Sequence, residues 1–119
     1  MSAAVTTRSL VRPALSAVVL AVLFTSIGQA AAVPAAPRKH TVIIEGTRFQ
    51  PESLTVKAGD TIVWVNKDLF PHTATASNST FDSQVIPAGA SWKYVAKKKG
   101  EFAYGCVFHP TMKADLMVK

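Results

Sequence analysis

The 119-residue sequence has one cysteine, Cys106, and only three histidines. A single cysteine cannot form a disulfide within the chain. Its remaining uses are as a small buried hydrophobic residue, as a bridge to another molecule or as a thiolate that binds a metal. Three histidines are too few for an enzyme with several metal centres, and neither a serine, histidine and acid set nor a carboxylate pair can be identified. We therefore do not expect an enzyme.

Acidic residues are also few: 7 Asp and Glu against 13 Lys and Arg. Without the first 32 residues, 11 basic and 7 acidic residues remain, a net charge of +4. A nucleic-acid-binding protein needs a clustered basic face or a recognition motif. The one short basic run, Lys97-Lys98-Lys99, is more typical of a solvated turn. We expect no nucleic-acid partner, and the basic balance favours steering toward an acidic protein.

No apolar run is long enough to span a bilayer comfortably, which takes about 20 residues. The uncharged apolar stretch Ala14–Gly28 follows Arg8 and Arg12 and precedes small residues, an order typical of a secretory signal. We expect a signal peptide over residues 1–32, a linker over 33–39 and one domain over 40–119. The mature protein would be exported to the periplasm or another extracytoplasmic space and would not insert stably in the membrane. An uncleaved N-terminal anchor is the alternative.

No window of helical length repeats its apolar residues with the 3.6-residue period of a helix. Short runs rich in Val, Ile and Thr alternate with turn residues instead, which is typical of strands. Alternation in the run before the last places Phe102, Tyr104 and Cys106 on one inward face, so the thiol would lie at the rim of the core. The regular spacing predicts an all-β antiparallel sandwich of about seven to eight strands. The runs cover residues 41–45, 53–57, 61–65, 72–76, 91–96, 101–106 and 114–118.

Three potential metal donors recur at intervals of three in the segment YGCVFHPTM: Cys106, His109 and Met112. Pro110 interrupts the set, which favours a tight loop leaving a strand over a helix. A thiolate, an imidazole and a thioether suit copper, and the blue-copper pattern asks for a second histidine, which His72 offers. Zinc is the competing metal, although a weak thioether ligand has little purpose in a structural zinc site.

The segments WVNKDLFPHTATA, FDSQVIPAGASWKY and YGCVFHPTM resemble the plastocyanin branch of the blue copper cupredoxins. The short Cys-x-x-His-Pro-x-Met form is similar to that of amicyanin. The resemblance implies a cupredoxin-type Greek-key β-sandwich with one copper ion per chain that cycles between Cu(I) and Cu(II). It also implies four ligands: the equatorial His72, Cys106 and His109 and the axial Met112.

Two further roles follow from the same resemblance. Asn66 would tie the two ligand-bearing loops together by hydrogen bonds, and the amide of Thr73 would donate to the cysteine sulfur. Such contacts fix the geometry of the ligands and shift the reduction potential of a metal site.

The family's function is to shuttle single electrons between exported redox proteins, so we expect a monomeric type 1 copper electron-transfer protein. In the family the electron passes through the exposed edge of the loop histidine, here His109. Phe70, Pro71, Phe108 and Pro110 would form a hydrophobic docking patch around it, or else are ordinary loop packing. Similarity to amicyanin implies an amine dehydrogenase as donor and a cytochrome as acceptor. A copper storage or delivery protein without a shuttle role is the alternative.

Overall fold

The computed structural model describes residues 2–19, 21, 22, 28–31 and 35–119. The chain divides into two compact units, Met1–Val33 and Pro34–Lys119. Among the described residues of the first unit there is neither a helix nor a strand. Across the described parts of the chain, no helix has the length and apolar character needed to cross a membrane. Part of the apolar run predicted as the core of a signal peptide, residues 20 and 23–27, lies outside the described residues.

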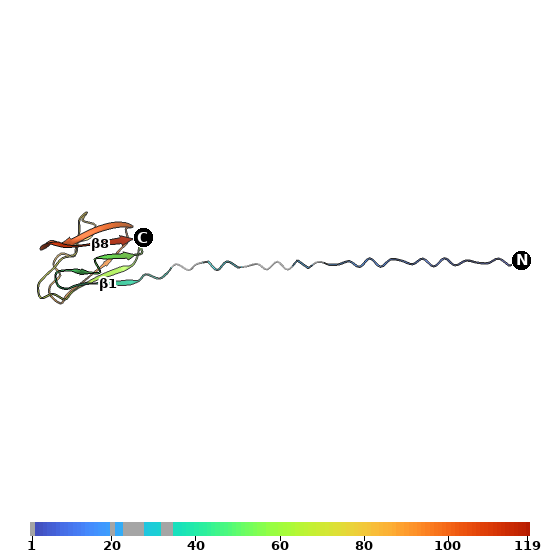
Figure 1. Ribbon diagram of the computed structural model, residues 1–119, viewed down its shortest axis with the longest axis horizontal. Coiled ribbons are helices and arrows are strands. Elements are labelled where there is room, and N and C mark those ends of the chain that lie inside the picture. The colour runs from blue at the N-terminus through green and yellow to red at the C-terminus, as the bar shows by residue number, and fades with distance from the viewer. Residues whose placement is uncertain (1, 20, 23–27, 32–34) are drawn as a thin grey trace. The chain divides into compact units, whose positions relative to one another are not determined.

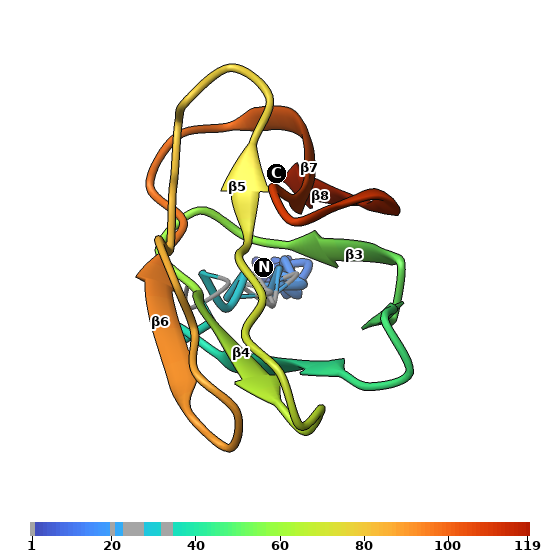
Figure 2. The same cartoon turned by 90° about the vertical axis from the view of Figure 1, so that its left-hand side faces the viewer.

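The second unit consists of two four-stranded sheets, and this confirms the predicted all-β sandwich (Figures 1 and 2). One sheet has the strand order β2-β1-β4-β6 and the other has the order β3-β8-β7-β5. The eight strands are β1 (Lys39–Ile44), β2 (Phe49–Gln50), β3 (Ser53–Val56), β4 (Thr61–Asn66), β5 (Thr75–Ala76), β6 (Ser91–Val95), β7 (Gly100–Cys106) and β8 (His109–Val118).

The pairing is mixed rather than purely antiparallel, which corrects the sequence-based prediction. β1 pairs with β4 in parallel from Lys39↔Thr61 to Ile44↔Asn66, and β3 pairs in parallel with β8. The chain crosses to the second sheet at β3 and returns to the first at β4, where it lies parallel to β1. The pairs β4–β6, β5–β7 and β7–β8 are antiparallel. The two-residue strand β2 was not predicted, because two residues are too few to show an alternation of apolar and polar side chains.

The predicted strand over residues 72–76 is mostly a loop, and only Thr75–Ala76 forms β5. The backbone groups upstream of β5 have other partners. His72 exchanges two hydrogen bonds with Ile86 as an isolated bridge, and the amide of Ala74 donates to the Ser83 hydroxyl at 2.7 Å. These bonds hold the segment at the rim of the sandwich, where it carries His72.

An aromatic core fills the space between the sheets. Trp64 is fully buried, and its ring lies 5.6 Å from the rings of both Phe81 and Tyr104. Each such aromatic pair contributes about 0.5–1.5 kcal/mol beyond the burial of its surface. In β7 the predicted inward residues Phe102, Tyr104 and Cys106 are all buried. Cys106 is the last residue of β7, so a rigid core positions its thiol at the end of the sandwich.

Candidate metal centre

The structure brings three predicted ligands together from separate parts of the chain. The side-chain donor atoms of His72, Cys106 and His109 all lie within 4.8 Å of one another. The Cys106 Sγ is 3.7 Å from the Nδ1 atom of each histidine. His72 comes from the β4–β5 connection, Cys106 ends β7 and His109 begins β8. Two imidazoles and a thiol therefore converge around one point.

The ligand segment is a strand rather than the predicted loop. β8 begins at His109, and only Val107 and Phe108 form the turn after Cys106. A register shift between Gly105 and Cys106 lets Cys106 pair with His109 across this turn. Pro110 is tolerated in β8 because it lies next to the turn and the register shift. A strand fixes the direction of its side chains more firmly than a loop does, so β8 holds His109 in a defined orientation.

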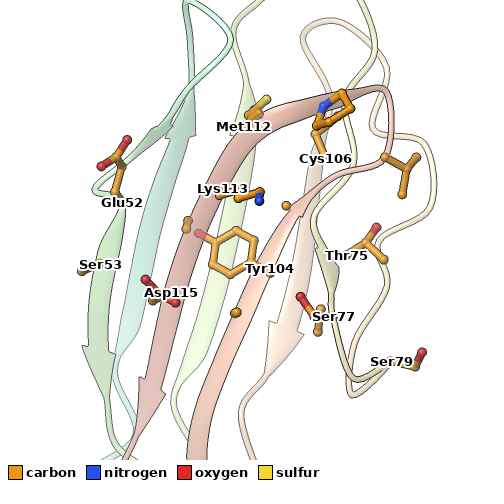
Figure 3. Close-up of a pocket in the computed structure, with 16 residues that line it drawn as sticks. Glu52, Ser53, Thr75, Ser77, Ser79, Tyr104, Cys106, Met112, Lys113 and Asp115 are labelled. Carbon is orange, nitrogen blue, oxygen red and sulfur yellow. The ribbon is translucent and has the colours of Figure 1, made fainter.

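Met112 lies on β8 three residues after His109 and is 3% exposed. Figure 3 shows it with Cys106 at the same end of a groove over β7 and β8, and polar residues such as Ser77 and Asp115 line the rest of the groove. A Cβ added to Gly105 would lie 2.8 Å from the carbonyl oxygen of Met112. The glycine thus permits a close approach of β7 to the backbone of Met112.

Asp68 holds His72, a contact that the sequence analysis did not predict. The Asp68 Oδ2 is 2.7 Å from the Nε2 of His72, which is fully buried. With Nε2–H donating to the carboxylate, the lone pair of Nδ1 is directed toward Cys106, a carboxylate–histidine arrangement common at metal sites. The sequence does carry a signal for this contact, because Asp68 lies four residues before the candidate ligand His72.

Backbone amides hold the Asp68 carboxylate in turn, with Gly46 N donating to Oδ1 at 2.7 Å and Thr47 N to Oδ2 at 2.9 Å. Burial opposes ionisation of Asp68, but these bonds and the bond to His72 outweigh it, so the pKa of the carboxyl is lowered. The carboxylate is therefore an ionised acceptor that orients His72.

Thr73 connects the two ligand-bearing segments. Its amide donates to the Cys106 Sγ at 3.4 Å, and its Oγ1 accepts a hydrogen bond from Val107 N at 3.0 Å. The residue after the first histidine is thus tied to the cysteine and to the turn that follows it. A hydrogen bond to sulfur removes electron density from a thiolate and so tunes a metal bound there.

Asn66 makes different hydrogen bonds from those predicted for it. Its Nδ2 donates to the carbonyl oxygens of Phe70 at 2.9 Å and Ile86 at 3.0 Å, and its Oδ1 accepts from Asp68 N. It therefore braces the His72 loop against the segment that ends at Ile86, and no bond from Asn66 to the Cys106–Met112 segment is found among the described residues. The Thr73 hydroxyl makes that connection instead.

Exposed apolar side chains surround the convergent donors. Phe70 is 45% exposed and Phe108 is 50% exposed, and both Pro71 and Pro110 are exposed. The Phe70 ring lies 5.8 Å from the ring of His109. Leu69, which the sequence analysis did not include, is also exposed. His109 is partly exposed within this rim, whereas His72, Cys106 and Met112 are buried.

The donors suit copper better than zinc. A type 1 copper site uses two imidazoles and one cysteine sulfur as strong ligands, with a thioether as a weak axial ligand. A structural zinc site uses four strong tetrahedral ligands and has no use for a thioether. The amide of Thr73 donates to the sulfur, a contact that would support a thiolate bound to a metal.

A type 1 donor set at the rim of a two-sheet β-sandwich defines a blue copper domain. The family model described as "Cupredoxin-like domain" matches residues 16–118, and the chain belongs to this family.

Individual relatives are similar over shorter stretches. Plastocyanin from Scenedesmus fuscus is 46% identical over 43 residues, which cover 36% of this chain and 39% of that protein. Amicyanin from Paracoccus versutus is 25% identical over 81 residues, covering 64% of this chain and 61% of the relative. The chain thus spans less than two thirds of either relative. A solved purple cupredoxin from Nitrosopumilus maritimus is 26% identical with a TM-score of 0.63, over 67% of this chain and 99% of that one.

Proposed function

We propose that this protein is a type 1 copper electron carrier. The equatorial ligands would be His72, Cys106 and His109, with Met112 as the axial ligand. The observation that carries the proposal is the convergence of both imidazole Nδ1 atoms on the Cys106 sulfur at 3.7 Å. Bound copper supplies a one-electron couple between Cu(II) and Cu(I) at a site of this kind.

The chain's own residues supply rigidity and exclude water. The Asp68 carboxylate fixes the His72 ring, and Thr73 fixes the Cys106 sulfur and the following turn. Three of the four donors are buried, so the ligands need not rearrange to accommodate solvent when an electron arrives or leaves. Buried ligands also argue against a storage or delivery protein, which needs exchangeable ones.

His109 is the donor that reaches the surface, and we propose that electrons cross there. The patch of Phe70, Pro71, Phe108 and Pro110 around it is apolar and exposed. Such a surface suits brief docking, because weak redox encounters use interfaces below about 1,200 Å². We infer exported redox proteins as partners, with an amine dehydrogenase as donor and a cytochrome as acceptor as the specific pair to test. No enzymatic activity of its own is expected.

The first test is to add Cu(II) to the protein and record visible and EPR spectra. We expect an intense thiolate-to-copper charge-transfer band and a narrow hyperfine splitting, both lost in His72→Gln. His40→Gln is the matched control, because His40 lies in β1 away from these donors and should leave both signals intact. A pale spectrum of ordinary copper in the unaltered protein would refute the site.

The second test addresses the docking patch. Phe108→Lys should slow electron exchange with a redox partner without changing the copper spectrum. Val95→Lys is the control, because Val95 is similarly exposed, 44% against 50% for Phe108, but lies on β6 at the other end of the strands. Equal exchange rates in the two variants would show that the patch does not contact the partner.

A further inference from the structure

Positive charge is concentrated at one end of the domain. Seven of the 11 Lys and Arg residues in the described range 35–119 lie there, and all seven side chains are exposed. We call this surface the basic end; it comprises Arg38, Lys39, Lys57, Lys97, Lys98, Lys99 and Lys119.

Backbone pairing brings these residues together from four segments. Gly59 N donates to Ala96 O at 2.7 Å, which joins the turn after β3 to the lysine run after β6. Ala58 N donates to Lys119 O at 2.8 Å, and Thr61 N donates to Arg38 O at 2.9 Å. Figure 1 shows the C terminus and the beginning of β1 at the same end of the domain. The short lysine run is thus part of a larger cationic surface, which the sequence alone did not show.

Few acids balance this charge. Asp60 and Glu101 are the acidic residues at the basic end, which leaves seven positive against two negative charges. Asp60 is buried, and its carboxylate accepts hydrogen bonds from the Arg38 and Lys57 amides and pairs with His40. The rest of the domain carries four Lys or Arg and five acids. Within the described residues, no basic-end side chain forms an ion pair within 4.0 Å.

The basic end cannot serve electron exchange efficiently. His109 is the first residue of the ten-residue strand β8, and Lys119 follows its last. Ten residues of strand span roughly 30 Å. Electron transfer through protein falls steeply over such a distance, so a partner docked here would not exchange electrons with the metal centre. A partner bound at the basic end would therefore serve another purpose than electron exchange.

We propose that the basic end binds the anionic headgroups of a lipid bilayer and holds the metal centre away from the membrane. Each Lys or Arg near an anionic surface strengthens binding by about five-fold, and seven on one end form a polybasic cluster. The chain also joins the domain here, since β1 begins at Lys39, after the apolar run Ala14–Gly28. If the apolar run Ala14–Gly28 is retained as an uncleaved anchor, it would tether the basic end to the bilayer.

The test uses the protein with its natural N terminus and sedimentation with phosphatidylcholine vesicles, with and without 30% phosphatidylglycerol. The quantity of interest is the ratio of the two partition coefficients, because insertion of an apolar segment contributes to both. The triple variant K97Q/K98Q/K99Q should lower this ratio by about 100-fold. The matched control, K67Q/K93Q/K113Q, removes the same charge away from the basic end and should leave the ratio nearly unchanged.

A second readout locates the surface. Acetylation of lysines on phosphatidylglycerol vesicles, followed by mass spectrometry, should show protection of Lys97, Lys98 and Lys99 but not of Lys67 or Lys113. Raising the salt to about 1 M, where the Debye length falls to ~3 Å, should abolish the protection. An equal effect of the two triple variants, or no preference for anionic vesicles, would overturn the proposal. Binding to polyglutamate without binding to vesicles would overturn it in favour of an acidic protein partner.

Discussion

Gly105→Ala is the substitution by which the close approach of β7 to Met112 can be tested. The added Cβ would lie 2.8 Å from the Met112 carbonyl oxygen, whereas ordinary contacts begin at 3.4 Å. The backbone of Met112 must therefore move by about 0.6 Å, the difference between these distances. This exceeds the ~0.5 Å within which a functional constellation must be held.

Two opposing terms set the stability of the variant. Replacing a strand glycine by alanine is favourable by about 0.5–1 kcal/mol. Overpacking a close contact costs about 1–3 kcal/mol. The contact is with backbone, which cannot rotate away as a side chain would, so the overpacking term should win. We expect a lower urea midpoint, a shifted charge-transfer band and weaker Cu(II) binding.

Gly59→Ala separates loss of stability from displacement of the ligand. Gly59 has φ +97°, and a Cβ there would meet nothing within 4 Å, at the end of the domain away from the ligands. Alanine is strained at such a φ, so the midpoint should fall while the copper spectrum stays unchanged. A Gly105→Ala protein with the unaltered spectrum and Cu(II) affinity would refute the claim that this glycine positions Met112.

Three further outcomes follow from the buried polar and aromatic groups. Asp68→Ala removes the acceptor of the His72 Nε2–H and should weaken Cu(II) binding by about 10- to 100-fold in a competition titration. The control is Glu101→Ala, because Glu101 is exposed and lies near the other end of β7 from Cys106. Equal Cu(II) affinities of the two variants would exclude the orienting role of Asp68. Hydrogen bonds from the Arg38 amide, the His40 side chain and the Lys57 amide lower the pKa of Asp60 from 3.8 to about 2. Its stabilising effect is present above pH 3.8 and is lost as the pH falls toward 2, so Asp60→Asn should flatten the acid limb of the stability–pH curve, and an unchanged limb would contradict this. Trp64 is fully buried among aromatic rings, so Trp92→Phe should leave a single tryptophan that emits at short wavelength and resists quenching by iodide; red emission would mean that the core is open to water.

Much of the fold could be predicted from the sequence, because a strand with one buried face alternates apolar and polar residues. The inward set Phe102, Tyr104 and Cys106 was predicted correctly, since a strand with one buried face repeats every two residues. The parallel pairing of β1 with β4 was not predicted, because alternation within a strand carries no information about the direction of its neighbour. In β8 the strand over residues 114–118 was predicted, but the strand character of residues 109–113 was missed. Pro110 breaks strands in most contexts, and the register shift beside it is a tertiary feature.

The donors were easier to predict than the groups that orient them. Thiol, imidazole and thioether side chains are rare in this chain, so their spacing is informative. The supporting bonds use common groups instead: a carboxylate at Asp68, a hydroxyl at Thr73 and the amides of Gly46 and Thr47. Which of many such groups reaches a given ligand depends on loop conformation, which local sequence does not specify. Asn66 illustrates this, since its bonds run to Phe70 and Ile86 rather than to the second ligand segment.

The position of β8 inside its sheet has a consequence for how the domain is made. β8 comes after the other seven strands along the chain, yet it lies between β3 and β7, and Ser53 pairs with Asp115, 62 positions later. Until β8 emerges from the ribosome, β3 has no neighbour in its sheet, and the second sheet cannot cover the core completely. Pairing between such distant segments is slow, because the entropy of closing the loop must be overcome first. The nascent domain therefore cannot complete its second sheet until β8 has been synthesised, and the strand that completes the sheet is also the one that carries His109 and Met112.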